Sequence, residues 1–217
     1  MGRGARWFAL VLLFGVLAVP PDATAQMVGV TGGASVATLT GDGAADDLET
    51  RTSVRAGVFT RYPLNDRLWI GPAIHYAEKG ARDGSDDLET ALSYLEIPVL
   101  LGFRVFEGAR YDANLFAGPR VAFEVQCFQE VSFLSGGERG TGFVECDDVD
   151  PPFGTKTVDV GVIAGAGFTY SLTETVSLVV NGAIDVGLSS IDEGTNARDL
   201  TNRVYFFEAG LGWALGR

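Results

Sequence analysis

The segment SYLEIPVLLGFRVF, residues 93–106, is largely apolar but carries two opposite charges. Side chains alternate between the two faces of a β-strand, so the residues of this segment divide into two sets. One set runs from Leu95 to Val105 and is wholly apolar, whereas the other contains Glu96 and Arg104. Because an unpaired buried charge is costly, the two faces must contact different surroundings. The apolar face therefore contacts either a protein core or lipid.

The first 25 residues predict export from the cell interior. Arg3 and Arg6 precede an apolar run from residue 7 to residue 19, and the small residues of Ala-Thr-Ala follow at 23–25. This order is typical of a cleaved secretory signal peptide. We expect cleavage after Ala25, which leaves residues 26–217 as one domain. No later stretch approaches the ~18 apolar residues that a membrane-spanning helix needs. The mature chain can therefore enter a membrane only as a closed barrel.

Alternation with a period of two residues recurs in eight segments. In each segment one set of alternate residues is apolar, and the other is rich in Gly, Ala and charged residues. Eight strands is the smallest number found in outer-membrane barrels. We therefore predict an all-β fold, a closed antiparallel up-and-down transmembrane β-barrel. The expected strands are residues 27–38, 52–62, 68–79, 93–106, 112–125, 157–170, 176–188 and 203–215.

The charged face of these strands distinguishes a transmembrane barrel from a soluble one. A soluble barrel directs its apolar face inward and leaves the polar face in water. Small residues with charges of both signs instead suit a narrow lumen, in which buried charges form pairs. A charge facing lipid would cost about 2–4 kcal/mol. The predicted lumen charges are Arg55, Arg61, Glu96, Arg104, Arg120, Glu124, Asp159, Asp185 and Glu208.

Strand heights suggest partners for two of these charges. Because neighbouring strands are antiparallel, side chains pair with others at a similar height in the barrel. We expect Glu96 to contact Lys79 or Arg55, and Arg104 to contact a carboxylate or a turn at its own end of the barrel.

The connections and aromatic residues favour lipid outside the barrel. Outer-membrane barrels alternate short periplasmic turns with long extracellular loops. Here the short connections lie near residues 63–67, 107–110 and 171–175, and the long ones near 39–51, 80–92, 126–156 and 189–202. All six Tyr residues lie near predicted strand ends, and Tyr94 is assigned to the long-loop rim. Aromatic side chains form girdles at both membrane interfaces. The expected girdle residues are Tyr62, Tyr76, Tyr111, Tyr170, Tyr205 and Trp213.

Several stretches resemble the PorT-like outer-membrane β-barrel domain family. They are MVGVTGGASVATLTGD, SYLEIPVLLGFRVF, FAGPRVAF, VDVGVIAGAGFTY and NRVYFFEAGLGWAL, and the run YLEIP at residues 94–98 is the most specific. The resemblance implies a barrel in the outer membrane, generally without an assigned activity, and no catalytic residues or cofactors. Its implied partners are outer-membrane lipid, lipopolysaccharide and the outer-membrane assembly machinery. The C-terminal sequence GWALGR departs from the terminal aromatic residue of typical assembly signals.

The long loops carry the excess negative charge of a chain whose formal net charge is −12. The sequence DDLET occurs twice, at residues 46–50 and 86–90. Acidic loops of this kind are either solvated surfaces or sites for divalent cations that bridge to lipopolysaccharide. The acidic balance also argues against nucleic acid as a partner.

Cys127 and Cys146 both lie in the longest connection. Two cysteines in an exported chain predict a disulfide, which would contribute about 3 kcal/mol by restricting the unfolded chain. Metal binding is not expected, because no second pair of ligands accompanies them.

Three functions remain open from the sequence. The favoured one is a non-enzymatic outer-membrane barrel with a structural or surface-interaction role, acidic loops and a closed polar lumen. The second is a small hydrolase or acyltransferase that uses His75, the only histidine, at the extracellular rim of the barrel. The third is a secreted binding barrel of lipocalin type.

Overall fold

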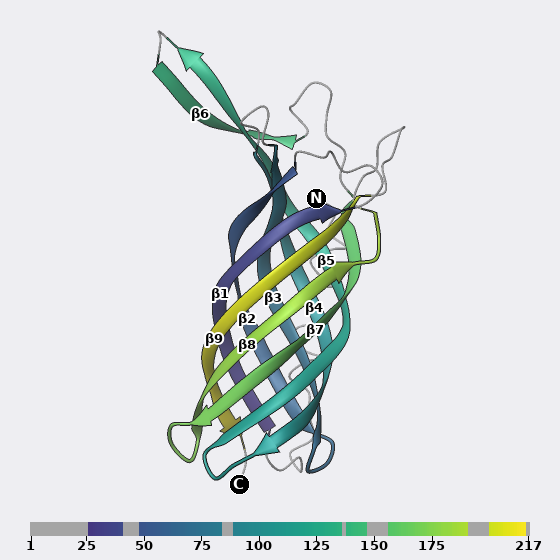
Figure 1. The fold of residues 1–217 in the computed structure, drawn as a ribbon, viewed down its shortest axis with the longest axis vertical. Helices are drawn as coiled ribbons and strands as arrows, with labels where there is room; N and C mark the ends of the chain where they lie inside the picture. The colour runs from purple at the N-terminus through teal and green to yellow at the C-terminus, as the bar shows by residue number, and fades with distance from the viewer. Residues whose placement is uncertain are drawn as a thin grey trace, which may run out of the picture.

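Antiparallel pairing of neighbouring strands closes this chain into a barrel (Figure 1). The computed structural model describes residues 26–40, 48–83, 89–135, 138–146, 156–190 and 200–215. The strands are β1 (Gln26–Thr40), β2 (Leu48–Pro63), β3 (Leu68–Asp83), β4 (Glu89–Glu107), β5 (Tyr111–Ser135), β6 (Glu138–Glu145), β7 (Val158–Ser171), β8 (Val176–Gly187) and β9 (Thr201–Leu215). None of these residues belongs to a helix long and apolar enough to cross a membrane.

Eight of the nine strands form the barrel wall. Their order around the wall follows the chain, and the pairings of β4 with β5 and of β1 with β9 close it. Gln26 at the start of β1 lies opposite Leu215 at the end of β9. The strand bundle therefore begins and ends at the same end of the barrel. The predicted eight-stranded up-and-down barrel is confirmed.

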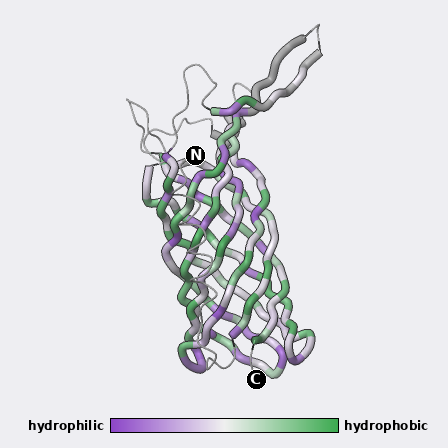
Figure 2. The backbone as a smooth tube through the Cα atoms, turned by 180° about the vertical axis from the view of Figure 1, so that it is seen from behind, coloured by the Kyte–Doolittle hydropathy of each residue, from purple (hydrophilic) through white to green (hydrophobic). Residues whose placement is uncertain are grey.

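The apolar face of each strand points outward. On β4, Leu101 is 51% exposed, whereas Glu96 on the opposite face is 0% exposed. Valine, leucine and phenylalanine side chains are exposed in the same way along the other strands of the wall. Figure 2 shows hydrophobic and hydrophilic residues alternating along the strands. A continuous apolar belt of this kind is typical of a surface that contacts the lipid of a membrane.

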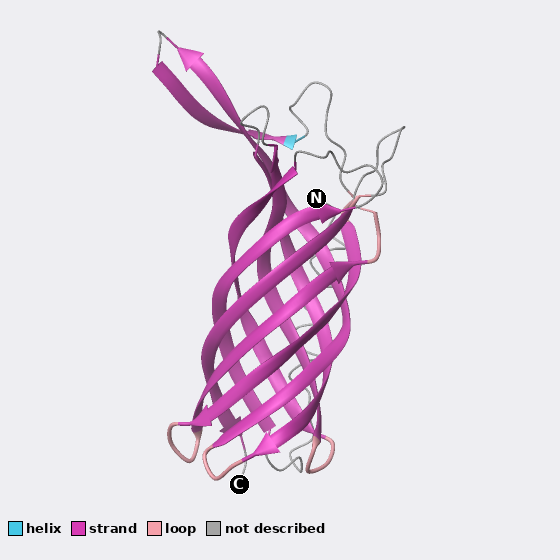
Figure 3. Cartoon of the chain, in the orientation of Figure 1, coloured by secondary structure: helices cyan, strands magenta, loops and turns pink. Residues whose placement is uncertain are grey.

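Three short turns join strands at one end of the barrel (Figure 3). In the β2–β3 turn, Asn65 Oδ1 accepts hydrogen bonds from the backbone N–H groups of Arg67 and Leu68, at 2.9 and 2.8 Å. In the β7–β8 turn, Thr173 Oγ1 accepts them from Thr175 and Val176, at 3.2 and 2.9 Å. These side chains replace the missing ladder partners, as Asn and Thr commonly do in turns.

The strands extend further toward the long-loop end than the sequence predicts. β3 continues to Asp83 and β4 begins at Glu89, so much of the predicted connection at residues 80–92 is strand. β6, which pairs with the end of β5, lies wholly inside the predicted loop at residues 126–156. The apolar alternation marks the part of each strand that contacts lipid. Antiparallel pairing continues beyond it, because polar residues are tolerated where both faces are in water.

Of the aromatic residues assigned to the rims, all but Tyr94 are exposed or partly exposed. Tyr76, Tyr111, Tyr205 and Trp213 are exposed on the outer surface, and Tyr62 and Tyr170 are partly exposed. The assignment of Tyr94 to the rim is wrong, because its side chain is 0% exposed and lies inside the barrel. Tyr94 shares its face of β4 with Glu96, so the alternation of that strand requires an inward direction.

The outward direction of Leu101 yields a first prediction. Leu101 lies within the outward apolar residues of β4, so Leu101→Arg should place a charge in the membrane at a cost of about 2–4 kcal/mol. We expect loss of the folded, heat-modifiable form on gels of outer-membrane fractions. Leu172→Arg, at an exposed leucine of the β7–β8 turn, is the matched control and should assemble normally. Equal assembly of both variants would contradict the outward assignment.

Candidate functional site

Seven charged side chains meet in the lumen, one from each barrel strand except β1. We call them the lumen network: Arg55, Lys79, Glu96, Arg120, Asp159, Asp185 and Glu208. All seven are buried. They come from strands on all sides of the barrel, so they meet only because the sheet is closed.

The network forms an unbroken chain of alternating charge. Lys79 Nζ lies 2.6 Å from Glu96 Oε1 and 2.9 Å from Asp185 Oδ2. Arg120 continues the chain, with Nε 2.6 Å from Asp185 Oδ1 and Nη2 2.9 Å from Asp159 Oδ2. Each cation therefore lies between two carboxylates, which compensates the cost of removing these charges from water.

Arg55 extends the chain in the other direction. Its guanidinium donates to Glu96, and its Nε lies 3.6 Å from Glu208 Oε2. Both partners expected for Glu96 thus contact it. Neutral groups cap the last carboxylate, since Asn181 Nδ2 donates to Glu208 Oε1 at 3.0 Å.

The opposite end of the chain is capped in the same way. Asp159 accepts hydrogen bonds from Ser189 Oγ at 2.9 Å and from Asn202 Nδ2 at 3.1 Å. Ser189 donates to Oδ1, and Asn202 adds a neutral donor to Oδ2, the oxygen that Arg120 also contacts.

β1 carries no charged residue of the network and instead has a glycine, Gly33, at the same height. Gly33 lies opposite both Arg55 on β2 and Glu208 on β9. A Cβ at Gly33 would lie 2.6 Å from Glu208 Cα and 2.0 Å from Phe207 O, so no other residue fits there without displacing backbone. An eight-stranded barrel is only wide enough to hold side chains, and such glycines make room for long charged ones.

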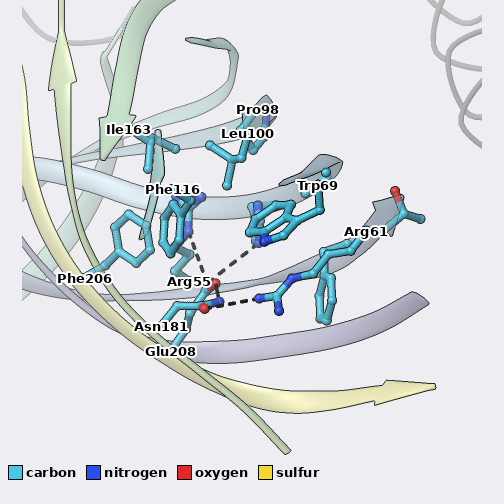
Figure 4. A pocket seen from close by; sticks show the side chains of 15 residues that line it. Arg55, Arg61, Trp69, Pro98, Leu100, Phe116, Ile163, Asn181, Phe206 and Glu208 are labelled. Atoms are coloured by element: carbon cyan, nitrogen blue, oxygen red, sulfur yellow. Dashed lines mark hydrogen bonds and ion pairs between the residues drawn. The ribbon is translucent and has the colours of Figure 1, made fainter. Parts of the chain in front are cut away.

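Below the network the lumen contains a layer of apolar side chains, so the predicted polar lumen is interrupted there. Figure 4 shows large side chains from several strands converging there. They surround a cavity of only about 30 Å³, which is the volume of a single water molecule. The buried and half-buried apolar side chains of this layer are Phe59, Trp69, Leu100, Phe116, Ile163 and Phe206.

Three predicted lumen charges lie outside the network. Arg61 lies in the apolar layer, where its guanidinium stacks on Trp69 (Figure 4). Arg104 lies at the short-turn end, 3.1 Å from Glu107 and 3.7 Å from Asp112. Glu124 lies at the long-loop end, beside the disulfide.

His75 is not at the rim, which contradicts the site expected for a rim enzyme. It is 4% exposed and pairs across the ladder with Glu96, in the middle of β3. Its Nε2 lies 3.7 Å from Glu208 Oε2 and 3.4 Å from Thr31 Oγ1. A substrate outside the cell could not reach it, so we treat His75 as part of the packed interior.

The sequence list of lumen charges misses Lys79, the central cation of the network. Lys79 lies on the inward face of its predicted strand and is named above only as a possible partner of Glu96. Asn181 lies on the inward face of its predicted strand and is also absent from that list, whereas Asn202 lies in a predicted connection, between Thr201 and Arg203. Reading every polar residue of the inward set, charged or not, would find Lys79 and Asn181.

The disulfide lies where the barrel wall becomes a hairpin. Cys127 and Cys146 are bonded, with their Cα atoms 5.5 Å apart, directly below the first β5–β6 pair, Phe128 and Glu145. The predicted disulfide is confirmed. Beyond it, β6 and the end of β5 project from the barrel as a two-stranded hairpin (Figure 1).

The acidic stretches proposed as cation sites lie largely outside the described residues, at 41–47 and 84–88. Within the described ranges, no group of three or more His, Cys, Asp or Glu side chains is placed to hold a metal ion.

The central position of Glu96 yields a second prediction. Glu96→Gln leaves three buried cations, Arg55, Lys79 and Arg120, with one carboxylate fewer, and we expect it to lower the free energy of unfolding by about 3–5 kcal/mol. Adding Lys79→Met should recover part of this loss, because it removes an uncompensated charge. Urea unfolding in lipid vesicles measures both changes.

Glu107→Gln is the matched control for Glu96→Gln. It removes a carboxylate from an exposed ion pair with Arg104 and should cost no more than about 1 kcal/mol. Equal costs for the two variants would show that the network does not stabilise the barrel.

Several solved structures are similar to this chain at low sequence identity. Ail, the attachment invasion locus protein of Yersinia pestis, is 12% identical with a TM-score of 0.44, over 86% of this chain and 97% of that one. OprG from Pseudomonas aeruginosa is 12% identical with a TM-score of 0.46, over 90% and 98%. The outer membrane protease OmpT from Escherichia coli is 11% identical with a TM-score of 0.43, over 92% and 100%. No curated protein matches the sequence.

A family model matches most of the chain. The model is described as the outer membrane protein beta-barrel domain and matches residues 24–193. Its description agrees with the closed barrel, the outward apolar belt and the short turns at one end. The chain belongs to the outer membrane protein beta-barrel domain family and is a protein of the bacterial outer membrane.

Proposed function

We propose that this protein is a non-enzymatic outer-membrane barrel that presents a rigid contact arm outside the cell. The observation that carries this proposal is the β5–β6 hairpin, which is continuous with the wall through β5 and braced at its base by the Cys127–Cys146 disulfide. In an outer-membrane barrel the short turns face the periplasm, so the hairpin lies on the extracellular side.

The filled lumen supports an interaction role over a transport role. The lumen network blocks the upper half of the barrel, and the apolar layer around Phe116 blocks the lower half. Water-filled channels require wider barrels. We therefore assign the lumen charges a structural role, and the rim aromatic residues the role of interfacial anchors.

The remaining partners are also proposals. Lipopolysaccharide would contact the outer belt and the acidic loops, with divalent cations between the two sets of anionic groups. The assembly machinery would insert the barrel after removal of residues 1–25. Within the family, the YLEIP run at residues 94–98 supports a place among the PorT-like barrels.

The alternatives fit the geometry less well. A lipocalin-type barrel needs an open apolar interior and a polar exterior, whereas this barrel has an apolar exterior and a filled interior. A rim enzyme needs a base that substrate can reach, and His75 is enclosed in the lumen.

A filled lumen predicts the absence of ion conduction. Purified protein in planar lipid bilayers should give no stable unitary current steps, because no continuous water path crosses the lumen network. Replacing Arg120, Phe116 and Ile163 together by Gly opens space in both layers and serves as a positive control. Stable current steps from the unmodified protein would contradict the proposed function.

An exposed hairpin predicts a defined proteolytic product. Trypsin added to intact cells should cut after Arg139, between the two cysteines. The product should migrate as one chain without reductant and separate into two fragments when the disulfide is reduced. Arg139→Gln should abolish that fragment pair. Protection of Arg139 in intact cells, with cleavage only after lysis, would place the hairpin inside and overturn the proposal.

A further inference from the structure

A second cavity lies at the periplasmic end of the lumen, separate from the lumen network. Its volume is about 100 Å³, and Met27, Pro63 and Trp69 form one apolar wall. Arg61, Asn114 and Thr169 supply polar groups to the same cavity. The volume corresponds to about three water molecules, so the cavity is suited to a ligand of a few heavy atoms.

Arg61 is the partly buried cation of this cavity. Its guanidinium lies 4.8 Å from the ring centroid of Trp69 and 5.4 Å from that of Phe59. Its hydrogen bonds go to neutral groups, Thr169 Oγ1 at 3.0 Å and Asn181 Oδ1 at 3.5 Å. In the described part of the chain it makes no salt bridge, unlike the cations of the lumen network. A guanidinium has five N–H donors, so donors remain for a further acceptor.

Arg104 and Asp112 also line the cavity, but they pair with each other. Arg104 Nε lies 3.7 Å from Asp112 Oδ1, and Arg104 Nη1 lies 3.1 Å from Glu107 Oε1. Arg104 Nη1 also donates to the backbone oxygen of Asp66 at 3.1 Å. Arg104 is thus held at the mouth of the cavity by two carboxylates and a backbone oxygen, and Arg61 is the cation available to a ligand.

Asn114 is a buried polar side chain that lacks a partner. It is 4% exposed, and its Oδ1 has no hydrogen-bond partner. Buried amides are almost always hydrogen-bonded, so an orphan beside a cavity indicates a missing group. Rotation of the amide by 180° exchanges its oxygen and nitrogen, so Asn114 can direct either a donor or an acceptor into the cavity.

We propose that this cavity binds a small aliphatic carboxylate from the periplasm. The planar carboxylate matches the guanidinium fork of Arg61. The Asn114 amide and the Thr169 hydroxyl, which already accepts from Arg61, donate further hydrogen bonds to its oxygens. The aliphatic part of the ligand lies against Trp69 and Met27. Free short-chain acids and the C-terminal end of a peptide both carry this group, and the peptide would extend out through the mouth.

Trp69 provides a fluorescent probe of the cavity. The variant Trp213→Phe removes the other tryptophan beyond the signal peptide, which lies on the lipid face. We would titrate this protein, extracted from membranes in detergent, with sodium propionate at constant ionic strength. We expect a saturable change in Trp69 fluorescence with propionate and no saturable change with propionamide or chloride. Titration with N-acetylalanine distinguishes a peptide end from a free acid. Its acetylamino group is too large for the cavity and must project through the mouth, so it binds only if the site accepts the end of a peptide.

Two variants test the assigned residues. Arg61→Met keeps the apolar stem but removes the charge, and should weaken propionate binding at least about tenfold. Asn114→Ala removes an unpaired buried amide, so it should weaken binding without lowering the unfolding temperature. Arg67→Met, at an exposed arginine of the β2–β3 turn, is the control and should bind as before. The proposal would be overturned if propionamide or chloride acted like propionate, or if the signal did not saturate. It would also be overturned if the folded Arg61→Met variant bound propionate as tightly as before.

Discussion

The structure depends on one chain of alternating charges across the lumen. It runs from Glu208 through Arg55, Glu96, Lys79, Asp185 and Arg120 to Asp159, and neutral donors cap both ends. No pair of neighbouring strands contains the whole chain, and pairs such as Lys79–Asp185 join strands that are not neighbours, so the complete chain forms only in the closed barrel. The outer face must instead be apolar, because a charge that faces lipid is costly. The sequence satisfies both requirements by alternating apolar residues, which face lipid, with polar and charged residues, which face the lumen.

Filling the lumen has a consequence for function. The charged layer and the apolar layer beneath it leave only small cavities between them. Groups that can contact a partner or a ligand therefore lie at the two ends of the barrel. At the extracellular end that is the hairpin above the disulfide. At the periplasmic end it is the cavity beside Arg61. In the proposed function, the wall holds these two separate surfaces at a constant distance.

Local alternation predicted the strands, their directions and the two partners of Glu96. It could not predict which charges meet across the lumen, because that depends on how far each strand is shifted against the next around the closed wall. Phe59, Phe116 and Phe206 point inward although they are apolar, so they interrupt the pattern that identifies the lumen face. β6 escaped detection because a hairpin in water needs no apolar face. The orphan amide of Asn114 is visible only once its neighbours are known.

The length of β5 has a mechanical consequence. A single uninterrupted strand runs from the periplasmic turn at Tyr111 to the tip of the hairpin at Ser135. Hydrogen bonds in a sheet lie perpendicular to the strands, so tension along β5 shears its ladders with β4 and β7 together instead of opening them one bond at a time. The disulfide passes the same load from β6 into β5 at the base of the hairpin. A partner that pulls on this arm therefore pulls on the whole barrel, anchored by its full belt of lipid contacts.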